Sequence, residues 1–175
     1  MAKQTITVFG SGTIAEASPS WRIAYDVGYQ LAKAGFVVAT GGYAGAQTAA
    51  CKGARDAGGS TLGVTTDEFL GWTKNAYVDQ EKRFPNWYER LCHLIAVGSG
   101  FVVLDGGTGT LVELLVSWEM LNKGIHTKPV AILGPYMQTA INALMVNPEV
   151  KLSKKIRFVV TPEAAVRYLT ETLRL

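Results

Sequence analysis

The amino-acid sequence predicts an α/β fold, in which a parallel β-sheet carries helices on both faces. Short runs of β-branched and apolar residues alternate with helical patterns along the chain, as in consecutive β-α-β units. The runs are almost continuously apolar, which is typical of strands buried on both faces. Three of the runs end in glycine-rich turns. We therefore expect a Rossmann-like, doubly wound parallel sheet in a single domain of residues 1–175.

Strands and helices are predicted to follow one another in regular order. Ser18-Pro19 provides the N-cap and first turn of the first helix, which ends at Ala34 because Gly35 follows. Gly58-Gly59 ends the second helix in the same way. The predicted strands are Thr5–Phe9, Phe36–Thr40, Ser60–Thr65, Gly100–Leu104, Pro129–Leu133 and Ile156–Val160. The later helices are Ala46–Ala57, Pro85–Val97, Thr110–Asn122, Pro135–Met145, and one from Thr161-Pro162 to the C-terminus.

One long stretch, Thr66–Phe84, has no regular pattern and carries many charged residues together with Trp72. Long irregular segments in compact domains are often functional lids or binding loops. We expect this segment to be a loop of that kind.

The composition is that of a globular protein and excludes several classes. The chain has 48% hydrophobic and 18% charged residues, which excludes disorder and low complexity. Its net charge of +3 is too small and too dispersed to indicate binding to nucleic acid or a membrane surface. No apolar run is long enough for a signal peptide or a membrane span, so we expect a cytoplasmic protein. Cys51 and Cys92 lack metal-ligand spacing and are interpreted as small core residues.

The glycine-rich turns are the first candidate binding site. The carboxyl ends of parallel strands meet at one edge of the sheet, where ligands bind in such folds. Exposed backbone amides at the following helix N-termini bind anions. One such turn is ordinary in a β-α connection, but three at one edge favour a small molecule that carries a phosphate. The candidate binding residues are Gly10, Ser11, Gly41, Gly42, Gly45, Gly106, Gly107, Thr108, Gly109 and Thr110.

Two common nucleotide-binding classes do not fit. The turn after the first strand nominally matches GxGxxA, but the second predicted strand ends in Ala39-Thr40-Gly41 and lacks the acidic residue that would bind a ribose. The chain also has no GK[ST] motif. These features exclude a dehydrogenase and argue against a P-loop triphosphatase.

Glu113 and Arg90 are the candidate chemical groups. Glu113 follows the third turn by about one helical turn, so it can face the same cleft. The spacing Thr110-x-x-Glu113 also fits a capping box, in which the glutamate only bonds the first helical amide. Arg90 belongs to the preceding predicted helix, and as an isolated arginine it also fits a solvated surface charge. Both alternatives remain open at this level.

Taken together, these segments resemble the LOG ("Lonely Guy") family. The family's hallmark is PGGxGTxxE, preceded by an arginine on the previous helix, and here Arg90 precedes Glu113 at the family's spacing. Asp105 replaces the proline of the motif, and Ala44–Ala46 replaces a more usual glycine-leucine-methionine run. The matching segments are Gly41-Gly42-Tyr43-Ala44-Gly45, Lys52–Gly59, Glu89-Arg90, Gly106-Gly107-Thr108-Gly109-Thr110-x-x-Glu113 and Gly124-Ile125-His126-x-Lys128-Pro129-Val130.

The resemblance implies a specific activity. Characterised LOG proteins are Rossmann-like cytokinin riboside 5′-monophosphate phosphoribohydrolases, and many also cleave AMP to adenine and ribose 5-phosphate. It implies that this chain hydrolyses the N-glycosidic bond of a purine nucleoside 5′-monophosphate, with Arg90 and Glu113 as catalytic residues. We expect no cofactor and no metal ion, because the sequence has no cluster of ligands at a suitable spacing. Other relatives in the wider superfamily bind molybdenum cofactor. The alternative is therefore a non-catalytic carrier of a nucleotide or a pterin cofactor.

The resemblance also implies a homodimer or an assembly of dimers. The predicted helices Pro85–Val97 and Thr110–Asn122 are rich in large apolar side chains, which is consistent with a subunit interface. An ordinary core face is the alternative interpretation. The apolar residues concerned are Trp87, Leu91, Leu94, Leu114, Leu115, Trp118 and Leu121.

Overall fold

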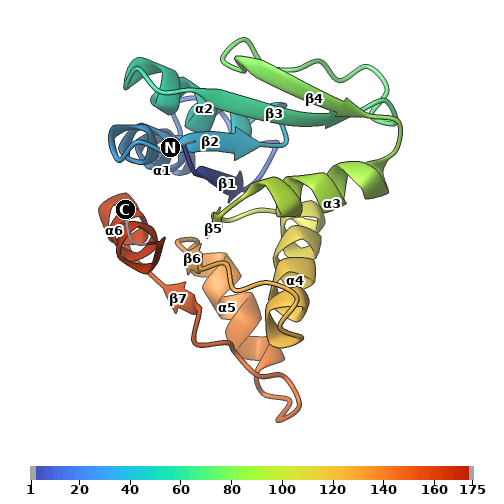
Figure 1. Ribbon diagram of the computed structural model, residues 1–175, viewed down its shortest axis with the longest axis vertical. Helices are drawn as coiled ribbons and strands as arrows, with labels where there is room; N and C mark the ends of the chain where they lie inside the picture. Colours follow the sequence, from blue (N-terminus) through green and yellow to red (C-terminus); the bar gives the residue numbers. More distant parts are fainter. Residues whose placement is uncertain (1–2, 174–175) are drawn as a thin grey trace.

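The structure is a computed structural model that describes residues 3–173, and within them it forms one seven-stranded sheet (Figure 1). The strand order is β4-β3-β2-β1-β5-β6-β7, and every neighbouring pair is parallel. This confirms the predicted α/β class. The strands are β1 (Thr5–Phe9), β2 (Val37–Thr40), β3 (Thr61–Thr66), β4 (Gln80–Phe84), β5 (Gly100–Val103), β6 (Val130–Ile132) and β7 (Ile156–Phe158).

Helices cover both faces of the sheet, and the sheet separates two hydrophobic cores. The helices α1, α2 and α6 pack on one face around side chains such as Ile6 and Val102, whereas α3, α4 and α5 pack on the other around Phe9 and Phe101. Successive strand residues alternate between the two cores, which explains why the strands are apolar throughout. The helices are α1 (Pro19–Lys33), α2 (Ala46–Asp56), α3 (Trp87–Val97), α4 (Thr108–Asn122), α5 (Pro135–Leu144) and α6 (Pro162–Leu173).

Local signals set the helix ends largely as predicted. The Ser18 hydroxyl accepts a hydrogen bond from the Trp21 backbone N–H at 3.2 Å, and Pro19 occupies the first turn. Two helix starts differ from the prediction. The helix α3 begins two residues later than expected, because the Asn86 side chain accepts from the Glu89 N–H at 2.8 Å. The helix α4 begins two residues earlier, at Thr108, with Gly107 as its N-cap.

The prediction of a continuous loop over Thr66–Phe84 is wrong, because β4 lies within it. This strand pairs with β3 at the edge of the sheet, and four of its five residues are exposed. Its charged sequence therefore carries no burial pattern, as is common for edge strands that must not pair with another chain. The remaining loop covers residues 67–79.

The three glycine-rich turns meet at the carboxyl edge of the sheet. The Ser11 N–H donates to the Asp105 carbonyl at 3.1 Å, and the Ala46 N–H donates to the Ser11 carbonyl at 2.8 Å. The first turn thus contacts both the second and the third, and all three form one continuous surface at the edge where ligands bind in this fold.

Several other sequence expectations can be compared with the structure. Cys51 is buried as predicted, but Cys92 is exposed, so its interpretation as a core residue is wrong. Within residues 3–173, no helix has both the length and the apolar character needed to cross a membrane. Most of the apolar residues expected at a subunit interface instead lie in the core, namely Leu91, Leu94, Leu114, Trp118 and Leu121, whereas Leu115 is 41% exposed.

Candidate active site

A cavity of about 360 Å³ opens at the carboxyl edge of the sheet. Residues 10–13 of the first glycine turn and residues 107–110 of the third line one part of it. Arg90 from α3 and Glu113 from α4 lie in its wall. The cavity is in the size range of small-molecule sites, and it combines backbone amides with one acidic and one basic side chain.

Arg90 and Glu113 form a buried ion pair. Nη1 of Arg90 lies 3.3 Å from Oε1 of Glu113, and the two side chains are 5% and 13% exposed. Nε of Arg90 donates a second hydrogen bond to the Val64 carbonyl at 2.9 Å. The guanidinium is therefore held by the end of β3 on one side and by the carboxylate on the other. This geometry excludes the interpretation of Arg90 as a solvated surface charge.

Gly41 makes room for this arrangement. A Cβ on Gly41 would lie closer than 3.0 Å to both Nη2 of Arg90 and Oε1 of Gln47. The guanidinium and the carboxamide thus converge on the space left by the missing side chain. Gly41 serves the site through its small volume, and its backbone φ is not in the left-handed region.

Burial raises the pKa of the Glu113 carboxyl to about 7, because desolvation disfavours the charged form. The charge of Arg90 and its hydrogen bond act in the opposite direction and keep the pKa from rising further. A carboxyl with this pKa exchanges protons readily near neutral pH, which suits a general base or acid.

The capping-box interpretation of Glu113 is wrong. The N-cap of α4 is Gly107, no side chain caps this helix, and Thr110 lies inside the first turn. Glu113 therefore lies beyond the capping positions, and its carboxylate bonds Arg90. Because the helix starts at Thr108, its exposed first amides face the cavity instead. With the positive end of the helix dipole, they form a suitable site for a phosphate.

The predicted binding residues divide into two groups. Six of them line the cavity: Gly10, Ser11, Gly107, Thr108, Gly109 and Thr110. The other four, Gly41, Gly42, Gly45 and Gly106, do not line it. Close packing accounts for Gly45 and Gly106, because a Cβ would meet the Ser11 carbonyl at Gly45 and the Thr110 hydroxyl at Gly106. Gly42 and Gly45 also have positive φ values of 80° and 63°, which favour glycine. These glycines allow the turns around the cavity to pack closely, without lining the cavity themselves.

Sequence reasoning missed several side chains of the wall. Trp72 and Phe69 come from the 67–79 loop, which the sequence singled out only as a whole. Trp87, interpreted as a core or interface residue, is half-buried and lines the cavity. Tyr43 lies in a segment that matches the LOG family, but its ring was assigned no role, and Gln47 gave no signal because a polar residue in a helix is common. Only the folded chain brings them to the cavity.

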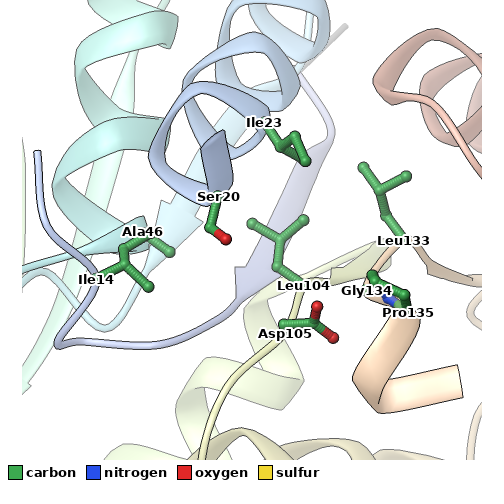
Figure 2. Close-up of a pocket in the computed structure, with 9 residues that line it drawn as sticks. All are labelled: Ile14, Ser20, Ile23, Ala46, Leu104, Asp105, Leu133, Gly134 and Pro135. Atoms are coloured by element: carbon green, nitrogen blue, oxygen red, sulfur yellow. The ribbon is translucent and has the colours of Figure 1, made fainter. Parts of the chain in front are cut away.

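A much smaller cavity of about 30 Å³ lies beside the site, between α1 and the start of α5 (Figure 2). It is far smaller than the cavity that holds Arg90 and Glu113, and too small for a nucleotide. Asp105 lines it, and Oδ1 of Asp105 accepts a hydrogen bond from the Met137 N–H at 2.9 Å. The residue that replaces the proline of the LOG motif therefore caps α5.

The chain is similar to known proteins in sequence and in fold. The chain is 32% identical over 141 residues to the cytokinin riboside 5′-monophosphate phosphoribohydrolase of Mycobacterium tuberculosis, a match that covers 75% of each chain. It is 30% identical over 136 residues to the cytokinin riboside 5′-monophosphate phosphoribohydrolase LOG5 of Arabidopsis thaliana, where the match covers 71% of this chain and 57% of the relative. The structure of the molybdenum cofactor binding protein from Rippkaea orientalis is similar over 99% of both chains, with a TM-score of 0.77 and 25% identity.

The family assignment rests on the extent of these matches. A family model described as "SLOG cluster4 family" matches residues 3–166, which is most of the chain. The resemblance to LOG proteins seen in the Arg90 and Glu113 motifs is thereby confirmed. The protein belongs to the SLOG cluster4 family and is a LOG-like protein.

Proposed function

We propose that this protein hydrolyses the N-glycosidic bond of a purine nucleoside 5′-monophosphate, either a cytokinin riboside monophosphate or AMP. The products are the free base and ribose 5-phosphate. The observation that carries the proposal is the buried Arg90–Glu113 pair, which lies in a cavity next to the N-terminus of α4. The names of the M. tuberculosis and A. thaliana relatives support the same activity.

The substrate phosphate binds at the start of α4 in this proposal. The amides of residues 107–110 and the helix dipole hold the anion. Residues 10–13 line the neighbouring wall. The phosphate takes no part in bond cleavage, so its binding energy serves to place the ribose against Glu113.

Glu113 acts on the ribose in the reaction. As the bond between C1′ and the base nitrogen breaks, its electron pair leaves with the base and positive charge develops on the ribose. The Glu113 carboxylate stabilises this charge and accepts a proton from the attacking water, whose oxygen bonds C1′. The departing base takes up one proton and Glu113 gives up the one that it accepted from water. Glu113 is thereby regenerated, and the net reaction consumes one water molecule.

Arg90 positions Glu113. Nε and Nη1 of Arg90 are engaged by the Val64 carbonyl and by Glu113, which favours an orienting role over direct contact with the base. Guanidinium remains charged at all accessible pH values, so it holds the carboxylate in one place throughout the reaction.

The test is to incubate the protein with AMP and with isopentenyladenosine monophosphate and to detect free base by chromatography. We expect the wild type to release the free nucleobase. We expect Glu113→Gln to lose at least a hundredfold in kcat, because glutamine cannot act as the general base. Glu119→Gln is a matched control, since Glu119 lies on the same helix and is exposed. Absence of base release by the wild type contradicts the proposal, as does full activity in Glu113→Gln.

A second candidate is a non-catalytic carrier of a pterin cofactor. The similarity to the molybdenum cofactor binding protein of Rippkaea orientalis, over 99% of both chains, favours it. Such a carrier needs the glycine turns but neither Glu113 nor Arg90. Calorimetry that shows tight binding of molybdenum cofactor, with unchanged affinity in Glu113→Gln and no hydrolysis of either nucleotide, would establish this function instead.

A further inference from the structure

One part of the cavity wall consists of aromatic rings. The Tyr43, Phe69 and Trp72 rings contact one another pairwise, with centroids 5.4 to 5.6 Å apart. All three line the cavity, and Trp72 is 50% exposed. A tryptophan that is half-exposed at a cavity adds little to the hydrophobic core, so this ring is available to a ligand.

Hydrogen bonds hold this aromatic wall in place. The Tyr43 hydroxyl accepts from the Thr66 N–H at 2.9 Å and donates to the Thr66 carbonyl at 3.3 Å. Asn75 binds the second glycine turn through its backbone N–H to the Gly42 carbonyl at 2.8 Å and through its side chain to the Tyr43 carbonyl at 2.8 Å. The 67–79 loop is thus tied to the turn that carries Tyr43. The rings are preorganised, which lowers the entropy cost of binding.

The aromatic wall adjoins the reacting groups. The guanidinium carbon of Arg90 lies 5.9 Å from the centroid of the Phe69 ring, and Arg90 contacts Glu113. On the side of the first glycine turn, a Cβ on Gly12 would lie 3.9 Å from Cζ3 of Trp72. A nucleotide with its ribose at Glu113 therefore has the rings within reach of its base.

Gln47 presents a hydrogen-bond donor to the same space. Its Oε1 accepts from the Tyr43 N–H at 2.9 Å, which orients the carboxamide. Nε2 then has no hydrogen-bond acceptor among residues 3–173, although Gln47 lines the cavity. Oε1 of Gln47 and Nη2 of Arg90 both approach the Gly41 Cβ position, whereas Nε2 of Gln47 and Cζ3 of Trp72 each lie 3.9 Å from the Gly12 Cβ position. The donor therefore lies on the Trp72 side of the carboxamide, close to Arg90.

We propose that the Trp72 and Phe69 rings, supported by the buried Tyr43 ring, form the stacking surface for the nucleobase. Gln47 donates a hydrogen bond from Nε2 to a ring nitrogen of that base. This inference rests on the proposed hydrolase function and assigns its base subsite. Flat aromatic rings bind the face of a base but offer little to a sugar phosphate. A ring nitrogen gains electron density when the glycosidic bond breaks, so a donor at that position favours departure of the base. Nε and Nη1 of Arg90 already bind the Val64 carbonyl and Glu113, which favours Gln47 over Arg90 as this donor.

The stacking surface is tested by calorimetry in the Glu113→Gln background, in which bound AMP is not cleaved. Trp72→Ala is expected to weaken AMP binding about tenfold or more, while the affinity for ribose 5-phosphate changes less than about twofold. Trp72→Phe is expected to recover most of the AMP affinity. Leu70→Ala is the matched control, because Leu70 lies in the same loop, is exposed and does not line the cavity.

These measurements separate the subsite from the hydrolase proposal. Unchanged AMP affinity in Trp72→Ala, or an equal loss for AMP and ribose 5-phosphate, overturns the stacking surface. If Trp72→Ala weakens AMP binding but the wild type releases no adenine, the base subsite is supported and the hydrolase proposal is refuted. Adenine release with the same KM in the wild type and Trp72→Ala refutes the subsite alone.

The Gln47 donor is tested with AMP analogues that lack one ring nitrogen, 3-deaza-AMP and 7-deaza-AMP. Gln47→Met is expected to lower kcat/KM for AMP about tenfold while leaving the affinity for ribose 5-phosphate within about twofold. One of the two analogues is expected to react slowly with the wild type and to show no further loss with Gln47→Met, as in a double-mutant cycle. Equal losses caused by Gln47→Met for AMP and for both analogues would overturn the role of Gln47.

Discussion

The guanidinium of Arg90 occupies the space that a side chain on Gly41 would fill. Arg90 comes from α3 and Gly41 from the end of β2, so the fold joins two segments that the chain keeps well apart. Nothing in the sequence indicates that Gly41 and Arg90 lie next to each other. In the structure, the missing side chain allows Arg90 to reach both Val64 and Glu113.

This relationship predicts the effect of Gly41→Ala. The added methyl group overlaps Nη2 of Arg90 and Oε1 of Gln47, which must move, and such overpacking costs about 1–3 kcal/mol. We expect kcat/KM for AMP to fall at least tenfold while the far-ultraviolet circular dichroism of the protein stays native. Wild-type kinetics in Gly41→Ala would show that the position of Arg90 does not matter.

The pH dependence of hydrolysis follows from Glu113. The mechanism needs the ionised carboxylate, and burial raises the pKa of Glu113 to about 7. The rate is therefore expected to increase as the pH rises through about 7 and to level off above it. Because Arg90 lowers the pKa of Glu113, Arg90→Met should move the profile to higher pH, in addition to reducing the rate. Rate profiles between pH 5 and pH 9 test both statements, and an unshifted profile in Arg90→Met would contradict the second.

Glu113 also links stability to pH. Its pKa is about 7 in the folded chain and about 4.3 in an unfolded one, so the folded protein binds this proton more tightly. The resulting stabilisation is fully present below about pH 4 and is lost as the pH rises through 7. The melting temperature of the wild type relative to Glu113→Gln should therefore fall between pH 5 and pH 8. Scanning fluorimetry of both proteins at these two pH values measures it, and a constant difference would argue against a raised pKa.

Asp105 is expected to matter for stability rather than for catalysis. Its carboxylate accepts from the Met137 N–H near the start of α5, and loss of a helix cap costs about 0.5–2 kcal/mol. Asp105→Ala should lower the melting temperature, whereas Asp105→Asn, which keeps an acceptor, should lower it less. Comparable melting temperatures for the wild type and Asp105→Ala would show that the cap contributes little.

Homodimer formation remains a prediction. The exposed apolar side chains on α3 and α4 include Tyr88 and Leu115, which are 68% and 41% exposed. We expect light scattering at micromolar concentration to give the mass of a dimer and Leu115→Glu to shift it toward the monomer, because a charge at an apolar interface is costly to desolvate. A monomeric wild type would exclude the dimer at that concentration.

The sequence by itself determined the alternation of strands and helices, the parallel sheet and the edge at which the glycine turns meet. These features follow from local signals: continuous apolar runs, Ser18-Pro19 at a helix start and Gly35 at a helix end. The strand β4 was not predicted, because its residues are mostly charged and exposed and therefore show no apolar pattern. The family motif singled out Arg90 and Glu113, although spacing alone allowed Glu113 to be a helix cap.

Only the tertiary structure decided what these residues do. The start of α4 at Thr108 removed the capping role of Glu113, and burial beside Arg90 set its pKa. The aromatic wall and Gln47 join the site through contacts between segments that are distant along the chain. Local sequence patterns report the environment of a residue within its own strand or helix. A cavity arises where several elements meet, so its chemistry is decided by packing.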